Sequence, residues 1–187
     1  LGLKEIGIKL DKNGFIPVSE KFETSKKDIY AIGDVINGPM LAHKAEEDAR
    51  ALIEMINGES GHIDYNLVPN IIYTSPEVAS IGLNEEQIQD SEINYNKGIF
   101  PFMANSRAKA IGHTDGFVKI LSDKKTDRIL GAHIIGHEAG TIIHELCFAM
   151  GFGASSEDVS RICHGHPTVN EAIKEAALAT YSNPIHS

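Results

Sequence analysis

A hairpin pattern in the second half of the chain constrains the fold most strongly. Residues 116–122 and 129–135 are mostly apolar and contain several β-branched side chains, and the polar stretch 123–127 separates them. Two such runs with a short polar turn between them predict antiparallel partner strands. Further strands are expected at 70–74, 78–82 and 93–102.

Helical patterns follow these strands along the chain. Helices are expected at about 138–150, 156–162 and 168–180, and Asn84 with Gln87 has the capping-box spacing that starts a short helix. Strands first and helices after, joined by short turns, predict an antiparallel sheet with helices packed on it. The expected fold class is therefore α+β.

The first third of the chain has a different pattern. Residues 29–32 form a short apolar run without alternation, which predicts a strand buried on both faces, and a helical pattern follows over 41–56. A buried strand that leads into a helix is typical of an α/β domain. We therefore expect residues 1–66 to be the tail of an α/β domain and residues 67–187 to be an independent α+β domain.

Charge and composition exclude several classes of function. The chain of 187 residues has 17 Lys and Arg against 26 Asp and Glu, a formal charge of −9, which disfavours electrostatic binding to nucleic acid or to a membrane surface. Two cysteines make no disulfide framework, which indicates a reducing compartment. Because the sequence begins at Leu1 without a methionine, we expect a fragment of a longer protein, with a removed tag or clipped leader as the alternative.

Asp34 is a candidate ligand-binding residue because of its position. It lies at the carboxyl end of the predicted buried strand, where open α/β sheets bind their ligands. Its carboxylate can accept hydrogen bonds from a sugar or ribityl diol, or it can bond the backbone amides of its own turn. The segment 38–42 then leads into a helix with few side chains in the way, and the first amides of this helix can contact a polar ligand atom.

The segment CHGHPTVNEA, residues 163–172, places two histidines before a predicted helix. Thr168 and Glu171 have the spacing of a capping box, so Glu171 has a purely structural explanation. In the functional interpretation Glu171 holds one ring nitrogen of His166, which fixes the tautomer and leaves the other nitrogen free for proton transfer. The two interpretations are compatible.

A zinc site is an alternative use of the same region. His144 and Cys147 are three residues apart on one predicted helix, and Cys163, His164 and His166 follow close together. The spacing lacks the tight pairs of zinc modules, and Cys147 lies within an apolar stripe. A buried structural cysteine is the preferred interpretation.

Five stretches of the chain resemble a known family. They are YAIGDV, MLAHKAEEDA, VPNIIYTSPEVASIG, LGAHIIGHEAGTIIHEL and HGHPTVNEAIKEA. They are similar to the dihydrolipoamide dehydrogenase family of flavoprotein disulfide reductases, and the resemblance covers nearly the whole chain. The HPT-x-x-E pattern belongs to the wider family, whereas CHGHPTVNEA is more similar to the lipoamide branch than to the glutathione reductase branch.

The resemblance implies that the chain is the carboxyl-terminal part of such an enzyme. Residues 1–66 would then be the last portion of an FAD-binding domain, with a remnant of the NAD domain, and 67–187 the interface domain. Asp34 corresponds to the residue that binds the ribityl chain of FAD. The segment that lies against the flavin ring corresponds to Met40, Leu41, Ala42 and His43.

The resemblance also implies catalytic residues and partners. His166 corresponds to the acid/base that reaches the active site of the other subunit in a homodimer, and Glu171 to the carboxylate that orients it. The whole enzyme would oxidise dihydrolipoamide, carried on the lipoyl domains of 2-oxo acid dehydrogenase complexes, with NAD⁺ through FAD and a redox disulfide. The expected compartment is the bacterial cytoplasm or the mitochondrial matrix.

The chain departs from the family pattern in what it lacks. It contains neither the C-x-x-x-x-C redox pair nor the Gly-rich dinucleotide fingerprints, so we expect it to be inactive by itself. Two alternatives stay open. One is the same part of a sibling reductase such as glutathione reductase, and the other is a stand-alone dimerising module, with or without zinc, that has no redox activity.

Overall fold

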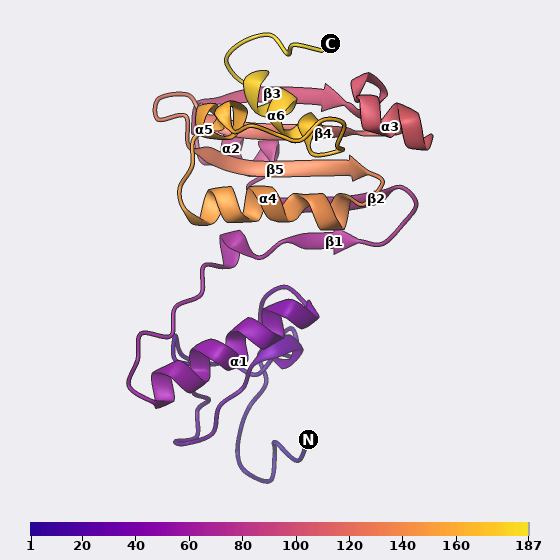
Figure 1. Cartoon of the computed structure of the whole chain (residues 1–187). Coiled ribbons are helices and arrows are strands. Elements are labelled where there is room, and N and C mark those ends of the chain that lie inside the picture. The colour runs from indigo at the N-terminus through magenta and orange to yellow at the C-terminus, as the bar shows by residue number, and fades with distance from the viewer. Residues whose placement is uncertain (187) are drawn as a thin grey trace. The chain divides into compact units, whose positions relative to one another are not determined.

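The computed structural model describes residues 1–186, and the chain separates into two compact units, Leu1–Asp64 and Tyr65–Ser187 (Figure 1). Each unit has its own hydrophobic core. Within the described residues no helix has both the length and the apolar character that a membrane crossing requires.

The second unit is built on one antiparallel sheet of five strands in the order β1-β2-β5-β4-β3. The strands are β1 (Asn70–Ile72), β2 (Glu77–Gly82), β3 (Tyr95–Pro101), β4 (Phe117–Asp123) and β5 (Ile129–Gly136). The expected hairpin is confirmed as β4 and β5, with Val118 paired to Ile134 and a register shift between Leu121 and Ser122. The α+β fold predicted from the sequence is confirmed as well.

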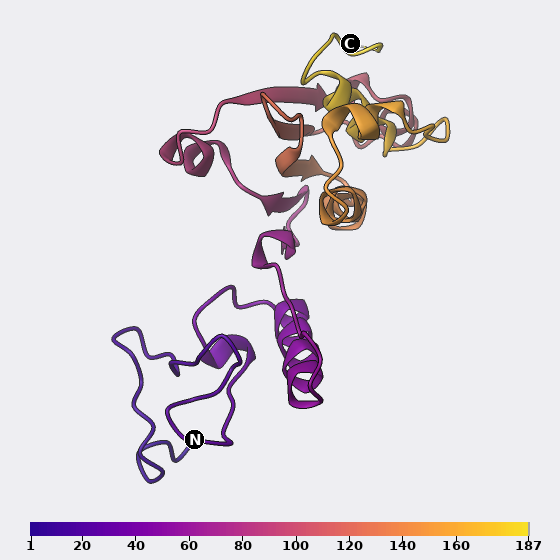
Figure 2. The same cartoon turned by 90° about the vertical axis from the view of Figure 1, so that its left-hand side faces the viewer.

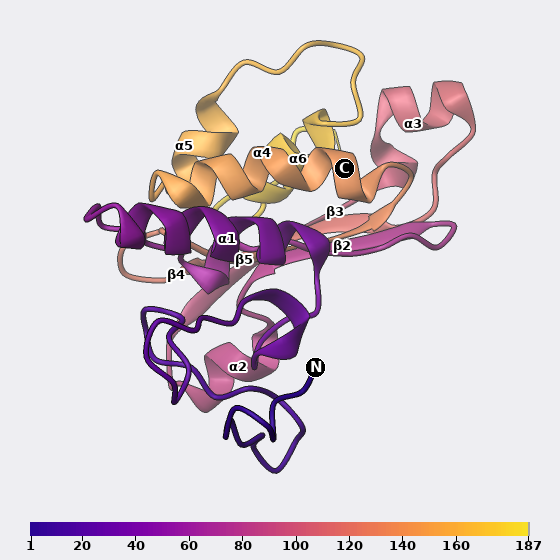
Figure 3. The same ribbon diagram turned by 90° about the horizontal axis from the view of Figure 1, so that it is seen from below.

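Helices cover both faces of this sheet unequally. Helices α4 (Ala139–Gly151) and α6 (Glu171–Leu178) lie on one face, and the short α2 (Glu85–Asp90) lies on the other (Figures 2 and 3). Two more short helices are α3 (Ser106–Ile111) and α5 (Ser156–Arg161). The capping box expected at the start of α2 is present, because the side chains of Asn84 and Gln87 each bond the backbone of the other.

The core between the sheet and α4 and α6 holds the helices in place. Side chains from one face of β4 and β5 meet side chains from both helices with almost no exposure, among them Ile120, Ile134, Ile143, Leu146 and Ile173. Helix α6 approaches β3 so closely that a Cβ atom on Gly98 would lie 2.0 Å from the carbonyl oxygen of Ala176. Only glycine therefore allows α6 to sit at this distance from the sheet.

The first unit differs from the expectation at residues 29–32. No strand forms there: Tyr30 makes one isolated antiparallel bridge to Glu23, and Ile29 and Tyr30 are each 38% exposed. A strand buried on both faces requires neighbouring strands and covering helices. The described residues of this unit supply one α-helix, α1 (Ala42–Ile56), but no neighbouring strand, so the prediction was wrong for the chain as it stands.

A buried ion pair joins the turn after this segment to α1 (Ala42–Ile56). Lys44 and Asp48, four residues apart on α1, are almost fully buried with Nζ and Oδ2 2.7 Å apart. The backbone N–H of Gly33 donates to Asp48 at 2.9 Å, and Lys44 donates to the Gly33 carbonyl at 3.2 Å. The pair thereby fixes the short 3-10 helix Gly33–Val35, which carries Asp34, against α1.

Candidate functional site

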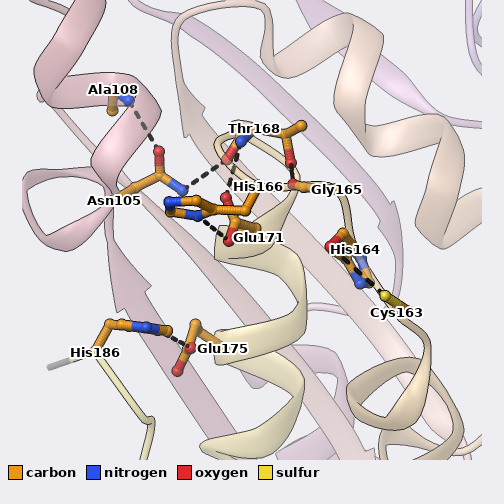
Figure 4. A network of polar contacts seen from close by, with 10 residues as sticks. All are labelled: Asn105, Ala108, Cys163, His164, Gly165, His166, Thr168, Glu171, Glu175 and His186. Carbon is orange, nitrogen blue, oxygen red and sulfur yellow. Dashed lines mark hydrogen bonds and ion pairs between the residues drawn. The ribbon is translucent and has the colours of Figure 1, made fainter.

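His166 lies in the loop between α5 and α6, and its ring is held by the first residue of α6. The Nδ1 atom is 2.9 Å from Oε1 of Glu171 (Figure 4). The peptide bond between His166 and Pro167 is cis. The side chain of His166 is 66% exposed and that of Glu171 only 20%, so the carboxylate is shielded while the ring faces outward.

The charge of Glu171 determines which ring nitrogen carries the proton. Burial acts to raise the pKa of this carboxyl, but the Thr168 N–H, the His166 ring and the His186 ring together outweigh it, so the pKa is lower than usual. An ionised carboxylate can only accept hydrogen bonds, so Nδ1 of His166 must be the donor. In the neutral ring the lone pair is then on Nε2, the nitrogen that is free to take a proton.

The capping box predicted for Thr168 and Glu171 is half correct. Oε2 of Glu171 accepts the backbone N–H of Thr168 at 2.8 Å, as the motif requires. The hydroxyl of Thr168, however, donates to the carbonyl of Gly165 at 2.7 Å and caps nothing in the helix. The residue before the helix is Asn170, without a side-chain cap, and α6 therefore begins at Glu171 and not at 168. The carboxylate of Glu171 therefore bonds the backbone of Thr168 and holds the ring of His166, so the contacts of the structural and of the functional interpretation are both present.

Asn105 supports this loop from the neighbouring helix, a role the sequence did not reveal. Its Nδ2 donates to the carbonyl of Thr168 at 3.0 Å, and its Oδ1 accepts the N–H of Ala108 as the cap of α3. Asn105 is 3% exposed, so both hydrogen bonds are shielded from water. The capping role could have been found from the asparagine before a helical run, but the contact to Thr168 spans 63 residues.

His164, the other histidine of the segment, has a structural role. Its Nε2 lies 2.7 Å from Oε1 of Glu145 on α4, and its Nδ1 lies 3.0 Å from the carbonyl of Ile162. Both partners are acceptors, so the imidazolium form, with two N–H donors, satisfies both. The hydrogen bond to Glu145 is the main reason that the pKa of His164 is raised. Glu145 also accepts from Asn170 at 2.7 Å, which ties the loop and the start of α6 to α4.

These contacts argue against the zinc alternative. Both ring nitrogens of His164 are engaged, and burial raises the pKa of the Cys147 thiol to about 11, which opposes the thiolate that zinc requires. Across residues 1–186 no group of three or more histidine, cysteine or acidic side chains is arranged to hold a metal ion.

An apolar hollow of about 610 Å³ lies beside this loop, between the end of α4 and α5. Its large apolar side chains are strongly exposed: Phe148 is 70%, Phe152 80% and Ile162 62% exposed. The two phenylalanine rings pack against each other with centroids 4.8 Å apart. We call Phe148, Phe152 and Ile162 the apolar patch. Exposed aromatic groups of this kind mark surfaces that bind a partner.

The residues predicted to contact a cofactor lie in the first unit. Asp34 is exposed, and its carboxylate forms no hydrogen bond within the described part of the chain, so it does not serve its own turn. Helix α1 begins at Ala42. The residue before it, Leu41, makes no side-chain hydrogen bond to the first turn of the helix. Met40 and Ala42 are exposed, whereas Leu41 and His43 are partly buried. A carboxylate without a partner and a helix start without a side-chain cap fit a ligand that has hydroxyl groups and polar ring atoms.

Two family models match the chain. Residues 68–177 match the dimerisation domain of the pyridine nucleotide-disulphide oxidoreductases, and residues 1–49 match a second model described as pyridine nucleotide-disulphide oxidoreductase.

Curated relatives match along the whole chain. It is 59% identical over 186 residues to the mitochondrial dihydrolipoyl dehydrogenase 2 of Arabidopsis thaliana, and 55% identical over 186 residues to the mitochondrial dihydrolipoyl dehydrogenase of Dictyostelium discoideum. The matches include all of this chain but only 37% and 38% of those relatives, so the chain spans little more than a third of their length.

Solved structures agree with the fold. LpdA from Mycobacterium tuberculosis superposes with a TM-score of 0.87 at 26% identity, over 95% of this chain and 39% of that one. The HOCl-induced flavoprotein disulfide reductase RclA from Escherichia coli gives 0.86 at 25% identity, over 95% and 41% of the two chains.

The pairing of His164 with Glu145 predicts a pH-dependent contribution to stability. A raised pKa in the folded state means that the contribution is fully present below the unfolded value of about 6.5 and is lost as the pH rises through the folded value. We expect Glu145→Gln to lower the free energy of unfolding by about 1.5–3 kcal/mol at pH 6, and by less at pH 9. Urea unfolding at both pH values measures this difference.

The matched control is Glu138→Gln, an exposed carboxylate just before α4. It should change stability little at either pH. An equal loss for Glu145→Gln at pH 6 and pH 9 would contradict the ionic pairing of His164.

Proposed function

This chain belongs to the pyridine nucleotide-disulphide oxidoreductase family, and we propose that it is part of a dihydrolipoyl dehydrogenase. The relatives that support this carry that activity in their names and are similar along all of this chain. We further propose that residues 1–66 belong to the FAD-binding domain and residues 67–187 to the interface domain. The activity, substrates and partners below are those of the whole protein.

His166 is the proposed acid/base, with Glu171 as the group that orients it. The observation that carries this proposal is the hydrogen bond between Nδ1 of His166 and Glu171, which leaves the lone pair on Nε2 of a ring that is 66% exposed. A thiol becomes a nucleophile only as its thiolate. Nε2 accepts the proton of the dihydrolipoamide thiol, and the thiolate then attacks the redox disulfide. Glu171 stabilises the imidazolium that forms, and this cation in turn stabilises the thiolate left on the enzyme.

The cofactors of the proposed enzyme are FAD and NAD. The residues of this chain that would hold FAD are Asp34, through its carboxylate, and Met40, Leu41, Ala42 and His43, through their backbone. When bound, FAD passes the electron pair of the dithiol to NAD⁺. The carboxylate of Asp34 suits the hydroxyl groups of a ribityl chain, because an ionised carboxylate accepts several hydrogen bonds and donates none.

A second copy of the chain is the proposed occupant of the apolar patch. The family model over residues 68–177 is described as a dimerisation domain, and the apolar patch lies within this range. Burying three large apolar side chains against a partner is favourable because it removes their surface from water. In such a homodimer, the resemblance implies that His166 serves the active site of the other subunit.

The lipoyl domains of a 2-oxo acid dehydrogenase complex are the proposed source of the dithiol. The two curated relatives named above are mitochondrial, which favours the mitochondrial matrix over the bacterial cytoplasm as the compartment. A stand-alone module without redox activity is the competing function, and an activity measurement separates the two.

The whole reading frame, extended upstream of Leu1, provides the test of the proposed reaction. We expect it to bind flavin and to reduce NAD⁺ with dihydrolipoamide, and to be a poor reductase of glutathione disulfide with NADPH. His166→Gln should lower turnover by about 10²–10⁴-fold with flavin still bound, because the thiol loses its base. The absorbance of NADH, followed in stopped-flow and steady-state experiments, measures the reduction of NAD⁺ and the turnover of the variant.

His113→Gln is the matched control, since His113 is exposed and lies away from the His166 loop. It should retain turnover. Full activity in His166→Gln would refute the acid/base role, and a protein without flavin or either activity would favour the stand-alone module.

The apolar patch predicts a change of oligomeric state. In the whole protein the double variant Phe148→Ser and Phe152→Ser should weaken the dimer, because two aromatic side chains of about 150–250 Å² each leave the interface. Light scattering coupled to gel filtration measures the mass over a range of concentrations. Met103→Ser, which removes a side chain that is 67% exposed elsewhere in the same unit, should leave the dimer intact. A double variant that stays dimeric at every concentration would exclude the apolar patch from the interface.

A further inference from the structure

Helix α6 carries a second carboxylate on the face that holds His166. Glu175 follows Glu171 by four residues, and residues at this spacing lie on the same face of a helix, one turn apart. The side chain of Glu175 is 4% exposed. A carboxylate that is this deeply buried is stable only when it is paired and hydrogen-bonded.

The end of the chain supplies both kinds of partner. Nδ1 of His186 is 2.6 Å from Oε1 of Glu175, and the backbone N–H of Ile185 donates to Oε2 at 2.6 Å. Glu171 has the same arrangement, with one oxygen on the Nδ1 atom of His166 and the other on a backbone N–H (Figure 4). The two rings are exposed to a similar degree, 62% for His186 and 66% for His166.

Both imidazole–carboxylate pairs line one small cavity of about 20 Å³, which is the size of a single water molecule. The titratable groups that face it are the two pairs themselves. The other lining residues come from β3, from the segment before α3 and from the first residue of α3, and all are uncharged: Phe100, Ala104, Asn105 and Ser106. The charge near His166 in this cavity is therefore set by Glu171 and by the state of the pair formed by Glu175 and His186.

We propose that His186 is a positioning residue for the His166–Glu171 pair: it neutralises Glu175 and so sets the charge under which His166 exchanges its proton. The inference rests on the proposed acid/base role of His166. Without His186, the carboxylate of Glu175 is an unpaired negative charge one turn from Glu171, and it stabilises the imidazolium form of His166. Without Glu175, a cationic His186 is left without its carboxylate, and its positive charge disfavours the imidazolium form of His166.

Removing the positive charge of His186 and removing the negative charge of Glu175 should therefore have opposite effects on the protonation of His166. The acid limb of the kcat/KM profile reports the protonation of the free enzyme's base. His186→Gln should move this limb to higher pH by about 0.5–1 pH unit, and Glu175→Gln should move it to lower pH by a similar amount. His186→Lys keeps a positive charge at position 186, so its limb should lie below that of His186→Gln.

The experiment uses the whole flavin-loaded enzyme, with dihydrolipoamide oxidation by NAD⁺ followed from about pH 5.5 to about pH 9, a range that includes the ordinary pKa of a histidine. His113→Gln, which lies outside this cavity, is the control and should leave the limb in place. At about pH 6 we expect His186→Gln to retain roughly a third to a tenth of the wild-type kcat/KM, which is the loss that such a shift produces.

Two results would overturn the proposal. In one, the acid limb of the kcat/KM profile stays in place in all three variants. In the other, it moves in the same direction in His186→Gln and Glu175→Gln, and His186 would then serve only to hold the C-terminal segment in place. Because Glu175 is buried, its variant can fail to fold. In that case the comparison of the acid limbs of His186→Gln and His186→Lys, two variants at an exposed position, tests the proposal by itself. If His166→Gln retains full turnover, the proposed function itself fails. If His166→Gln is inactive while the limbs do not move, only the role of His186 fails.

Discussion

The two hydrogen bonds accepted by Glu171 are the interaction on which the candidate site depends. One oxygen holds the ring of His166 and the other holds the backbone of Thr168, so a single ionised side chain fixes both the loop and the tautomer of its histidine. The bond to Thr168 uses one half of a capping motif, while the other half is given up because the threonine hydroxyl bonds Gly165. The loop therefore closes on itself before α6 begins.

The surrounding structure keeps this carboxylate in position. Asn105 bonds the loop from α3, and His164 bonds it to α4 through Glu145, so helices α3, α4 and α6 all hold the loop between α5 and α6. Helix α6 itself is held against β3 at Gly98, where no larger residue fits. Rigid support of this kind is what an acid/base requires, because proton transfer depends on the position of the accepting nitrogen.

What could be predicted from the sequence was local. The β4–β5 hairpin and the capping box of α2 follow from residues within a few positions of each other, and both predictions hold. The strand expected at 29–32 was wrong because a buried strand depends on neighbours that the described residues do not include. The proton-holding pair of His166 and Glu171 was also visible in the spacing. The bond from Asn105 to Thr168 and the pair of Glu175 and His186 were not, because tertiary packing alone brings those residues together.

The tautomer of His166 is the most direct test of its proposed role, and it is measurable on this chain without cofactor or substrate. Long-range ¹⁵N–¹H correlation spectra of the histidine-labelled protein, recorded at a pH where the ring is neutral, distinguish the protonated ring nitrogen from the one with the lone pair. The hydrogen bond to Glu171 predicts a proton on Nδ1 and the lone pair on Nε2, with a mixture of tautomers in Glu171→Gln. A proton on Nε2 in the unmodified chain would contradict it, because the nitrogen that faces outward could then not accept the proton of a thiol.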